Sequence, residues 1–255
     1  MTALGAIRCV WLRYFDVYRK SLIYGLVTTF VEPLLYLFAF GFGLGSMVGK
    51  VNVLGAELTY RQFIFAGIVG QTIMFQAFFE AAYGSFIRMY YQRIFQAIAV
   101  TPITLSEVLW AELFWDASKA SFAATAVLAI GVLMGDFRFW GAVLSLPLCF
   151  AGALLFAALG LLVAAKSKTI EEISYPQYLL IFPMFLFCGV FFPLSNLPPY
   201  LQWLAWTLPL TSIVSLTRTL TLGTPTEPLA FAVIIVWLAF VTPFSRNAMS
   251  RRLIR

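Results

Sequence analysis

Six apolar stretches, each long enough to cross a lipid bilayer, occupy most of this 255-residue chain. A helix needs about 20 apolar residues to span the hydrocarbon core, and lipid cannot satisfy the backbone groups of open strands. The alternating pattern of an outer-membrane barrel is absent. We therefore predict an all-α polytopic membrane protein that forms one transmembrane domain over residues 1–255. The six predicted spans are 22–47, 61–84, 112–134, 139–165, 173–193 and 228–245.

The composition excludes several kinds of catalytic site. Only 11% of the residues are charged and 62% are hydrophobic, whereas a soluble domain carries roughly 25% charged residues. The absence of histidine excludes Ser-His-Asp catalysis and histidine metal sites. Cys9, Cys149 and Cys188 lie far apart, without the spacing of a metal site or a disulfide framework. We predict no catalytic residue, no metal and no nucleic-acid partner, and attribute the net charge of +6 to loops that face anionic lipid.

The distribution of Lys and Arg predicts the orientation of the chain. An even number of spans places both termini on one side of the membrane, and cytoplasmic loops carry an excess of basic residues. Lys119 lies inside a span, and four basic residues fall on the far side: Lys50, Arg61, Arg138 and Arg218. Twelve fall on the side of the termini, which we predict to be cytoplasmic: Arg8, Arg13, Arg19, Lys20, Arg88, Arg93, Lys166, Lys168, Arg246, Arg251, Arg252 and Arg255.

Residues 1–21 predict an amphipathic helix that lies on the inner leaflet. Apolar residues recur at helical spacing, and the basic residues fall mostly elsewhere around the helix, as is typical of interfacial helices. The alternative is that this segment simply extends the first span. The apolar stripe consists of Leu4, Ile7, Trp11, Tyr14, Tyr18 and Leu22.

Residues 85–106 form the longest predicted cytoplasmic loop, and its sequence is aromatic and apolar for a solvated segment. A short helix with a polar and an apolar side suits docking into a groove on another protein, and Pro102 ends it before the next span. The alternative is a helix that lies on the membrane. The polar side carries Arg88, Gln92, Arg93 and Gln96, and the apolar side carries Met89, Ile94, Phe95 and Ile98.

The predicted outer segment 194–227 is rich in proline yet remains apolar. The pieces between prolines are too short to span the membrane, so we predict two short helices that dip into the outer leaflet and return. Trp203 and Trp206 fit an aromatic belt at the interface. The prolines in and beside this segment are Pro193, Pro198, Pro199, Pro209, Pro225 and Pro228.

Ionisable residues inside predicted spans are candidates for function, because burying charge in lipid is unfavourable. Glu32 lies in the first span and precedes Pro33, which frees a backbone carbonyl and favours a kink. Glu32 is either part of a transport path or a structural acid bonded to a neighbouring helix. We expect Glu80 to reach the interface. A structural or docking role is favoured for Glu112, Asp116 and Lys119, which share one helix face.

Three runs of sequence carry a resemblance to a known family: EPLLYLFAFGFGLG at 32–45, VTPIT at 100–104 and CGVFFPLSNLPPYLQWLAWTLPLTSIVSLTR at 188–218. They resemble type-2 ABC exporter permeases, most closely the NodJ-type proteins that export lipo-oligosaccharides or drugs. The likeness extends over nearly the whole chain. Relatives often carry a histidine after the L-P-L-T motif, where this chain has Ser212.

The resemblance implies a multi-pass permease of the bacterial inner membrane. Two copies would pair in lipid and work with two copies of a separate nucleotide-binding ATPase subunit. That subunit would bind ATP and Mg, since the glycine-rich run 41–50 lacks the spacing of a phosphate-binding loop. The chain itself would be no enzyme and bind no cofactor. Its substrate would be an amphiphile, such as a lipo-oligosaccharide, a lipid-linked glycan or a hydrophobic drug, taken from the cytoplasm or the inner leaflet. The alternative is an ion-coupled secondary transporter of small hydrophobic molecules.

The resemblance also assigns residues to a coupling element and an outer gate, while the acid inside the first span and the aromatic content suggest residues for a translocation path. Aromatic faces can stack on sugar rings or flat drugs, so the translocation path includes aromatic residues. The coupling element would contain Arg88, Tyr91, Arg93, Phe95, Thr101 and Pro102. The translocation path would contain Glu32, Tyr36, Phe40, Phe75 and Phe79. An outer gate would contain Pro193, Pro198, Pro199, Trp203 and Arg218, on short helices near 196–208 and 211–221.

Overall fold

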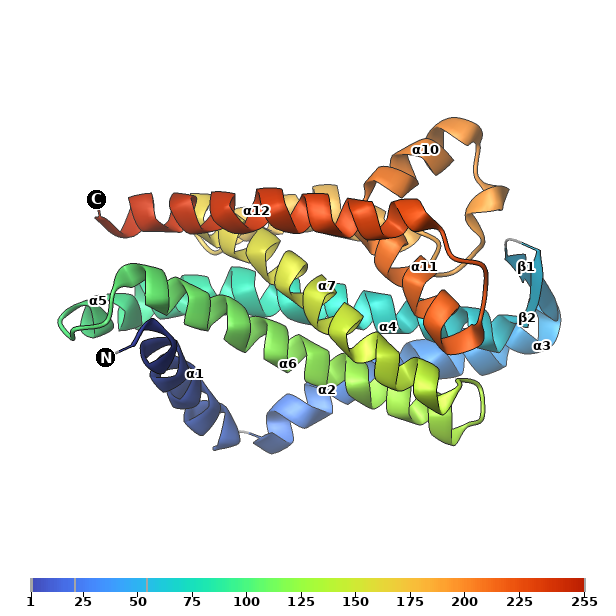
Figure 1. Cartoon of the computed structure of the whole chain (residues 1–255), viewed down its shortest axis with the longest axis horizontal. Helices are drawn as coiled ribbons and strands as arrows, with labels where there is room; N and C mark the ends of the chain where they lie inside the picture. The colour runs from blue at the N-terminus through green and yellow to red at the C-terminus, as the bar shows by residue number, and fades with distance from the viewer. Residues whose placement is uncertain (1, 21, 54, 255) are drawn as a thin grey trace.

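An elongated bundle of helices makes up the computed structural model, which describes residues 2–20, 22–53 and 55–254. Residues 1, 21, 54 and 255 lie outside the described part, as do the predicted boundary at residue 21 and the basic Arg255. Both ends of the described chain lie at one end of the bundle, together with α5, and a β-hairpin and α10 lie at the other (Figure 1). The two ends therefore lie close to the same end of the bundle, and their placement on the cytoplasmic side of a membrane stays a prediction.

The helical elements in chain order begin with α1 (Ala3–Arg19), α2 (Leu22–Tyr36), the π-helical η1 (Leu37–Leu44) and α3 (Gly45–Val48). After the hairpin come α4 (Tyr60–Phe79), η2 (Glu80–Gly84), η3 (Ile87–Tyr91), α5 (Ile94–Ala99), α6 (Leu105–Leu133) and α7 (Phe139–Lys166). The rest are η4 (Glu171–Ile173), α8 (Ser174–Pro176), η5 (Gln177–Ile181), α9 (Phe182–Phe187), η6 (Leu194–Asn196), α10 (Pro199–Thr207), α11 (Pro209–Leu222) and α12 (Pro228–Ile254).

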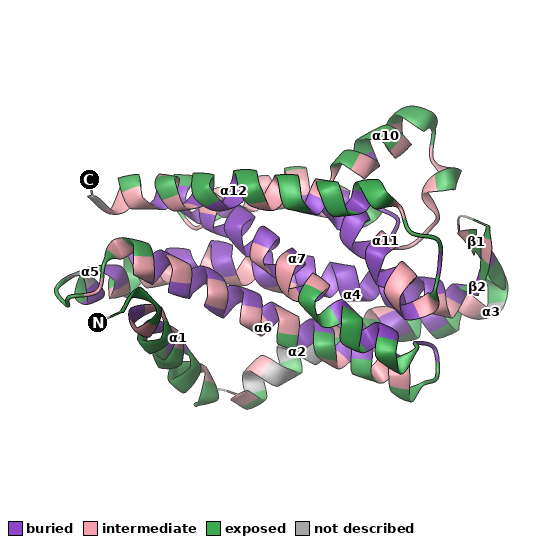
Figure 2. Cartoon of the chain, in the orientation of Figure 1, coloured by how far each residue is buried: buried purple, intermediate pink, exposed green. Residues whose placement is uncertain are grey.

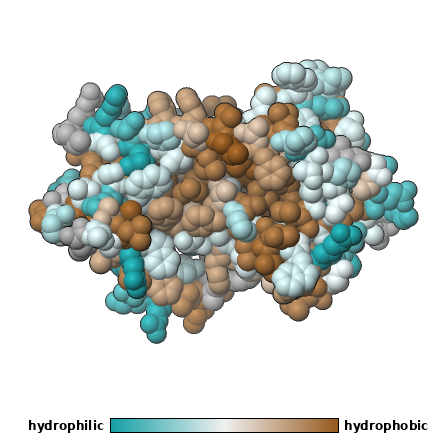
Figure 3. Space-filling view, viewed as in Figure 1, coloured by the Kyte–Doolittle hydropathy of each residue, from teal (hydrophilic) through white to brown (hydrophobic). Residues whose placement is uncertain are grey.

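Among the described residues, four helices are long and apolar enough to cross a membrane. Figure 3 shows, on the face in view, a hydrophobic region across the middle of the bundle, with hydrophilic residues gathered towards both ends. The four helices contain or closely match the predicted spans 61–84, 112–134, 139–165 and 228–245. They extend over Tyr60–Tyr90, Leu105–Leu133, Phe139–Lys166 and Pro228–Leu253.

The other two predicted spans are helical but interrupted. The segment 22–47 begins as α2 and changes to π-helical geometry at Leu37, four residues after Pro33. Proline lacks the N–H that an α-helix needs and disturbs the turn before it. The segment 173–193 breaks into short helical pieces that end at Phe187, and Gly189 follows with a positive φ. Six uninterrupted spans are therefore not what the structure contains.

Helix starts follow from capping residues in the sequence. Thr104 and Glu107 form a capping box at the start of α6, in which each side chain bonds the other residue's backbone N–H. This cap starts α6 at Leu105, seven residues before the predicted span. Thr59 and Gln62 form the same box at the start of α4. Polar residues can therefore start these helices before the apolar stretch begins.

α4 and the second half of α7 form the centre of the bundle, as the nearly continuous burial of these two segments shows (Figure 2). α7 packs against α4, α6, α11 and α12. The closest approach of α7 to the η2 end of α4 occurs at Gly160, where an added Cβ would lie 2.5 Å from the carbonyl oxygen of Phe78. A glycine is needed there because the obstacle is backbone, which cannot move aside as a side chain can.

A short β-hairpin is an addition to the predicted all-α fold. β1 (Lys50–Val53) pairs antiparallel with β2 (Ala56–Thr59), with Lys50 opposite Thr59. Gly55 has a positive φ in the turn, and its N–H donates to the Asn52 side chain. These four-residue strands are too short for sequence periodicity to reveal them.

Candidate functional site

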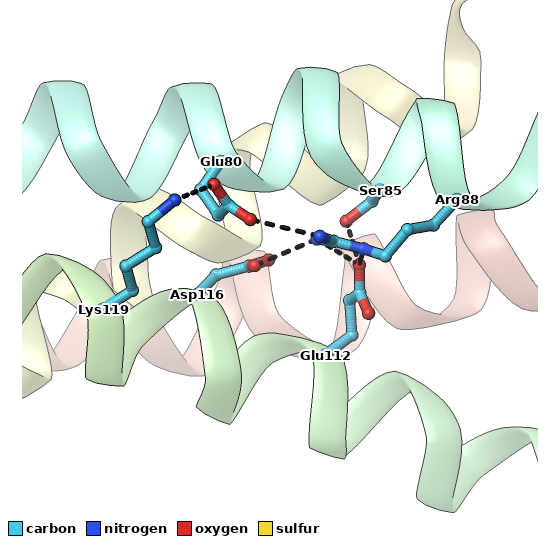
Figure 4. A network of polar contacts seen from close by, with 6 residues as sticks. All are labelled: Glu80, Ser85, Arg88, Glu112, Asp116 and Lys119. Carbon is cyan, nitrogen blue, oxygen red and sulfur yellow. Dashed lines mark hydrogen bonds and ion pairs between the residues drawn. The ribbon is translucent and has the colours of Figure 1, made fainter. Parts of the chain in front are cut away.

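A cluster of buried charges joins the end of the continuous helix through α4, η2 and η3 to α6 (Figure 4). The Arg88 guanidinium lies 2.7 Å from a Glu112 carboxylate oxygen, 3.1 Å from Glu80 and 3.2 Å from Asp116. Lys119 lies 2.6 Å from the other oxygen of Glu80. Glu112 and Asp116 are fully buried, and the Arg88 side chain is only 12% exposed. These distances describe a tightly paired network, not a set of solvated surface charges.

The cluster contains more carboxylates than cations. Glu80, Glu112 and Asp116 face Arg88 and Lys119, and one carboxylate oxygen of Glu112 and one of Asp116 have no hydrogen-bond partner. Buried ion pairs are stabilising only when the geometry is good, and removing one partner leaves an uncompensated buried charge. The α4–α6 joint therefore depends on Arg88, which contacts all three acids.

Arg88 has a different environment from the one expected for a coupling residue on the surface. η3 continues the α4 helix as far as Tyr91, so residues 85–91 are part of a helix and not of a loop. This extension carries the guanidinium back over Glu112 and away from solvent. The structure places Arg88 beneath the α5 segment, where its buried guanidinium can position that segment.

The amphipathic α1 covers the ionic cluster. The ring of Tyr14 lies 5.2 Å from the Arg88 guanidinium carbon, and the ring of Tyr18 lies 5.1 Å from the Lys119 ammonium nitrogen. Both distances are within the range of cation–π attraction. Trp11 donates a hydrogen bond to Ser118 at 3.3 Å. Burial, and next the negative charge of Glu112, raise the pKa of Tyr14, so its phenol stays neutral.

α1 is thus held against α6 through its aromatic residues. Trp11, Tyr14 and Tyr18 all have ring contacts to Trp115, with centroids 5.7 to 6.1 Å apart. α1 ends at Arg19 and runs in a different direction from α2 (Figure 1), which excludes a simple extension of the first span. Leu4 of the predicted apolar stripe is instead exposed. The second half of the stripe, from Trp11 to Tyr18, therefore packs against the protein and not against lipid alone.

α5 and its flanks form an exposed platform at the end of the bundle. Arg93 has a φ of 52°, in the left-handed region, and this residue turns the chain from η3 into α5. Met89, Phe95 and Ile98 are buried, and Ile94 packs against the core, as the amphipathic pattern predicts. The exposed side chains belong to Tyr91, Arg93, Gln96, Thr101 and Pro102. The buried Phe95 fixes the inner side of the platform, while these exposed side chains face outward.

The aromatic residues predicted for the translocation path lie in one continuous row. The rings of Tyr36, on α2, and Phe40, on η1, stack on each other with centroids 6.1 Å apart. The rings of Phe75 and Phe79, both on α4, stack with centroids 5.4 Å apart. Phe185 on α9 links the pairs, because it lies 5.7 Å from Tyr36 and 5.1 Å from Phe75. Phe185 is not among the residues predicted for the path.

Glu32 lies one helical turn before Tyr36 and faces α4. A side-chain hydrogen bond joins it to Gln71, which lies one turn before Phe75. α2 and α4 run antiparallel, so this set of six residues continues from the Glu32–Gln71 pair in two opposite directions, through Tyr36 and Phe40 on one side and through Phe75 and Phe79 on the other. We call these six residues with Phe185 the aromatic seam. Its polar pair, Glu32 and Gln71, lies between the two aromatic pairs.

Phe191 was also missed, although it completes the seam at the far end. Its ring lies 4.8 Å from both Phe40 and Phe185. The signal was present in the aromatic run from Phe182 to Phe192. Sequence alone did not indicate which of these rings turn inward, because α9 ends at Phe187 and the chain continues without a regular period.

At the end opposite the termini, α10 and α11 form the two short helices predicted there. Pro199 and Pro209 occupy their first turns, where a missing N–H is tolerated. Pro193 and Pro198 have extended backbones just before η6 and α10, and Trp203 is exposed on α10. These residues lie on the surface of the predicted gate.

Arg218 differs from the other residues assigned to this gate, because its side chain points into the protein. It donates hydrogen bonds to the carbonyl oxygens of Phe63 at 3.2 Å and Gly189 at 2.6 Å. Arg218 thereby connects α11 to α4 and to the turn after α9. Ser212, where relatives often carry histidine, is fully buried, and its hydroxyl has no hydrogen-bond partner.

The glycine-rich run 41–50 has no phosphate-binding geometry. Its first part is the π-helical η1, and α3 follows directly. Small residues in a membrane span favour close helix packing, which predicts such contacts at Gly41, Gly43 and Gly45, but only Gly41 is buried. Gly43 is exposed, and an added Cβ at Gly45 would make only an ordinary contact, 3.9 Å from the carbonyl oxygen of Phe40. The packing expectation was therefore wrong for these two glycines.

The chain is similar to known transport proteins along nearly its full length. The family model described as ABC-2 type transporter matches residues 5–222. Nodulation protein J of Rhizobium leguminosarum bv. viciae is 33% identical over 248 residues, which cover 96% of this chain and 94% of that protein. Nodulation protein J of Sinorhizobium fredii is 34% identical over 96% of this chain and 93% of its own length. Inner membrane transport permease YadH of Escherichia coli is 26% identical over 91% of this chain and 90% of its own length.

Proposed function

Because this chain belongs to the ABC-2 type transporter family, we propose that it drives export as a homodimer with two copies of a separate ATPase subunit. It is a multi-pass integral membrane protein of the bacterial inner membrane and a permease subunit of an ABC transporter. Permeases of this family work with a separate ATP-binding subunit. ATP and Mg belong to that subunit in our proposal, and the permease transmits its motion.

The α5 platform is the observation that carries this proposal. Its outer side presents Tyr91, Arg93, Thr101 and Pro102, while Phe95 fixes its inner side. Beneath it, Arg88 connects the same helix to α6 through Glu112 and Asp116. A push on the platform would therefore move α4 and α6 as one rigid unit. Rigid-body movement of packed helices is a general way to transmit such a change.

The aromatic seam supports an amphiphilic substrate. Its rings can stack on sugars or flat drugs, and Glu32 with Gln71 provides a polar contact within the seam. We propose a lipo-oligosaccharide, a lipid-linked glycan or a hydrophobic drug as the substrate, taken from the cytoplasm or the inner leaflet. An acyl tail would remain near lipid while the polar head passes along the seam.

An exposed apolar stripe on α2 and η1 supports burial in lipid or against a second copy. Val31, Leu35, Phe38 and Phe42 are large apolar residues with substantial exposure on this side of the helix. A soluble monomer rarely exposes so continuous an apolar surface. We propose that the second copy covers part of this stripe and that membrane lipid covers the rest.

Copurification tests the proposed function directly. The tagged chain is purified from its native membrane, and the bound proteins are identified and assayed for ATP hydrolysis. We expect an ATPase subunit in a one-to-one ratio. A homo-oligomer without any ATPase would contradict the proposal and favour an ion-coupled secondary transporter. Dissipating the proton gradient at constant ATP separates these two functions, because only the secondary transporter would stop.

A further inference from the structure

Arg218 is a buried cation without an anionic partner. Its residue is only 6% exposed, and no ion pair joins it to a carboxylate in the described residues 2–20, 22–53 and 55–254. An isolated charge in a low-dielectric interior is unfavourable unless opposite charge or hydrogen bonds compensate it. The other strongly buried cation, Arg88, contacts three carboxylates. Arg218 therefore lacks the kind of compensation found elsewhere in the same protein.

The contacts that Arg218 does make use only part of the guanidinium. A guanidinium has five N–H donors, and both carbonyl hydrogen bonds come from Nη2. Nε is buried without a partner, and no hydrogen bond from Nη1 is found among the described residues. The Phe63 ring covers one face, with its centroid 3.7 Å from the guanidinium carbon. A purely structural role of tying Phe63 and Gly189 together accounts for Nη2 alone.

Arg218 lines a cavity of about 170 Å³ between α4, α10, α11 and the β-hairpin. Sites for drug-sized ligands are about 300–1,000 Å³, so this cavity suits one chemical group and not a whole amphiphile. Phe63 and Cys188 provide apolar wall. The polar side chains around Arg218 are hydroxyls and amides: Asn52, Ser195, Gln202, Thr211, Ser215 and Thr224.

We propose that this cavity is a binding site for an anionic group on a hydroxyl-bearing head, such as a carboxylated sugar or a phosphoglycerol. Arg218 would supply the positive charge, and the surrounding hydroxyls and amides would bind the neighbouring hydroxyl groups. Charge-assisted bonds from Arg to carboxylate or phosphate are about twice as strong as neutral hydrogen bonds. The role of this cavity as an exit subsite for the exported head group rests on the proposed function. Binding of an anionic group in the cavity does not depend on that function.

Binding is measured on the purified full-length chain, without an ATPase, by isothermal titration calorimetry at constant ionic strength. The soluble probe is methyl glucuronide, and the neutral methyl glucoside is its matched control. The lipid source is tested by native mass spectrometry of chain taken from phosphatidylcholine vesicles with or without phosphatidylglycerol. We expect saturable binding of the anionic probe in one of the two arms and none of the glucoside. The arm that responds identifies the source of the head group.

Arg218→Gln should weaken this binding at least about tenfold, since a charge-assisted hydrogen bond contributes roughly 1.5–3 kcal/mol. Arg138→Gln is the matched control, because Arg138 is an exposed cation near the same end of the bundle. That variant should bind within about twofold of the original, the ±0.5 kcal/mol range of most surface changes. Equal loss in both variants, or binding that Arg218→Gln leaves intact, would overturn the proposal.

A second variant keeps the test decisive if Arg218→Gln does not fold. Ser215→Leu leaves Arg218 in place and fills the cavity, so it should abolish binding while the protein remains folded. Retention of binding in Ser215→Leu would overturn the proposed location. Absence of binding by the unaltered chain in both arms would overturn the site without affecting the ATPase copurification, which tests the proposed function separately.

Discussion

The Arg88 guanidinium lies 2.7 Å from the carboxylate of Glu112, which is fully buried at the junction of α4 and α6. The two residues are 24 positions apart in the chain, and the α5 platform lies between them. Their contact closes the base of that segment. The same guanidinium also contacts Glu80 and Asp116, so one side chain holds the charges of both helices together.

Replacing Arg88 should destabilise the protein and not simply uncouple it. Arg88→Gln would leave Glu112 and Asp116 buried without their cation, and breaking a buried pair in this way costs about 3–5 kcal/mol. Thermal unfolding in detergent, followed by tryptophan fluorescence, measures the loss. Arg93→Gln is the control, because Arg93 is exposed and surface changes usually remain within about 0.5 kcal/mol. Equal stability of the two variants would contradict the structural role of the cluster.

The α5 platform should separate coupling from folding. Tyr91→Ala combined with Arg93→Ala removes exposed side chains, so transport should fall while ATP hydrolysis and the unfolding temperature remain. Phe95→Ala removes a buried ring and should cost about 3–5 kcal/mol of stability. Transport, ATPase activity and unfolding are compared in reconstituted vesicles. Normal transport by the double variant would place the coupling surface elsewhere.

The aromatic seam should be needed for transport on one side of its helix only. Tyr36→Ala should reduce export several-fold, because Tyr36 connects Phe40 with Phe185. Phe38→Ala is the matched control, since Phe38 is an exposed aromatic residue two positions further along the same continuous helix. Glu32→Gln should likewise impair export more than folding. Export rates are measured in vesicles that contain equal amounts of each variant. Equal losses of export in Tyr36→Ala and Phe38→Ala would argue against a role of the seam in transport.

The contact of α7 with α4 should tolerate no side chain at Gly160. A Cβ there would lie 2.5 Å from the Phe78 carbonyl oxygen, so Gly160→Ala should destabilise by about 1–3 kcal/mol, as overpacking does. At Gly45 an added Cβ would make only an ordinary contact, 3.9 Å from the Phe40 carbonyl oxygen. Gly45→Ala should therefore be neutral or stabilise by about 0.5–1 kcal/mol, because alanine loses less backbone entropy than glycine on forming a helix. Thermal unfolding should show a lower unfolding temperature for Gly160→Ala and an unchanged or higher one for Gly45→Ala. A neutral Gly160→Ala would show that the helices can separate there.

Sequence determined those features that depend on local periodicity and on transfer from water to lipid. The apolar length of the segments predicts the four long helices, and proline spacing predicts α10 and α11. The amphipathic pattern of residues 94–98 correctly assigns Ile94, Phe95 and Ile98 to the inner side of α5. These predictions succeed because each depends on residues within a few turns of one another.

Tertiary structure decided which distant residues meet. Glu80, Arg88 and Glu112 are individually visible as unusual charges, but only the packing of α4 on α6 makes them one cluster and buries Arg88. The π-helical geometry from Leu37 and the break after Phe187 interrupt two of the predicted spans, so apolar length overestimated the number of unbroken spans. Arg218 was recognised, but its side chain proved to point inward. Periodicity records which face of a helix is apolar, whereas the partner of a buried charge is set by three-dimensional proximity, which sequence separation does not encode.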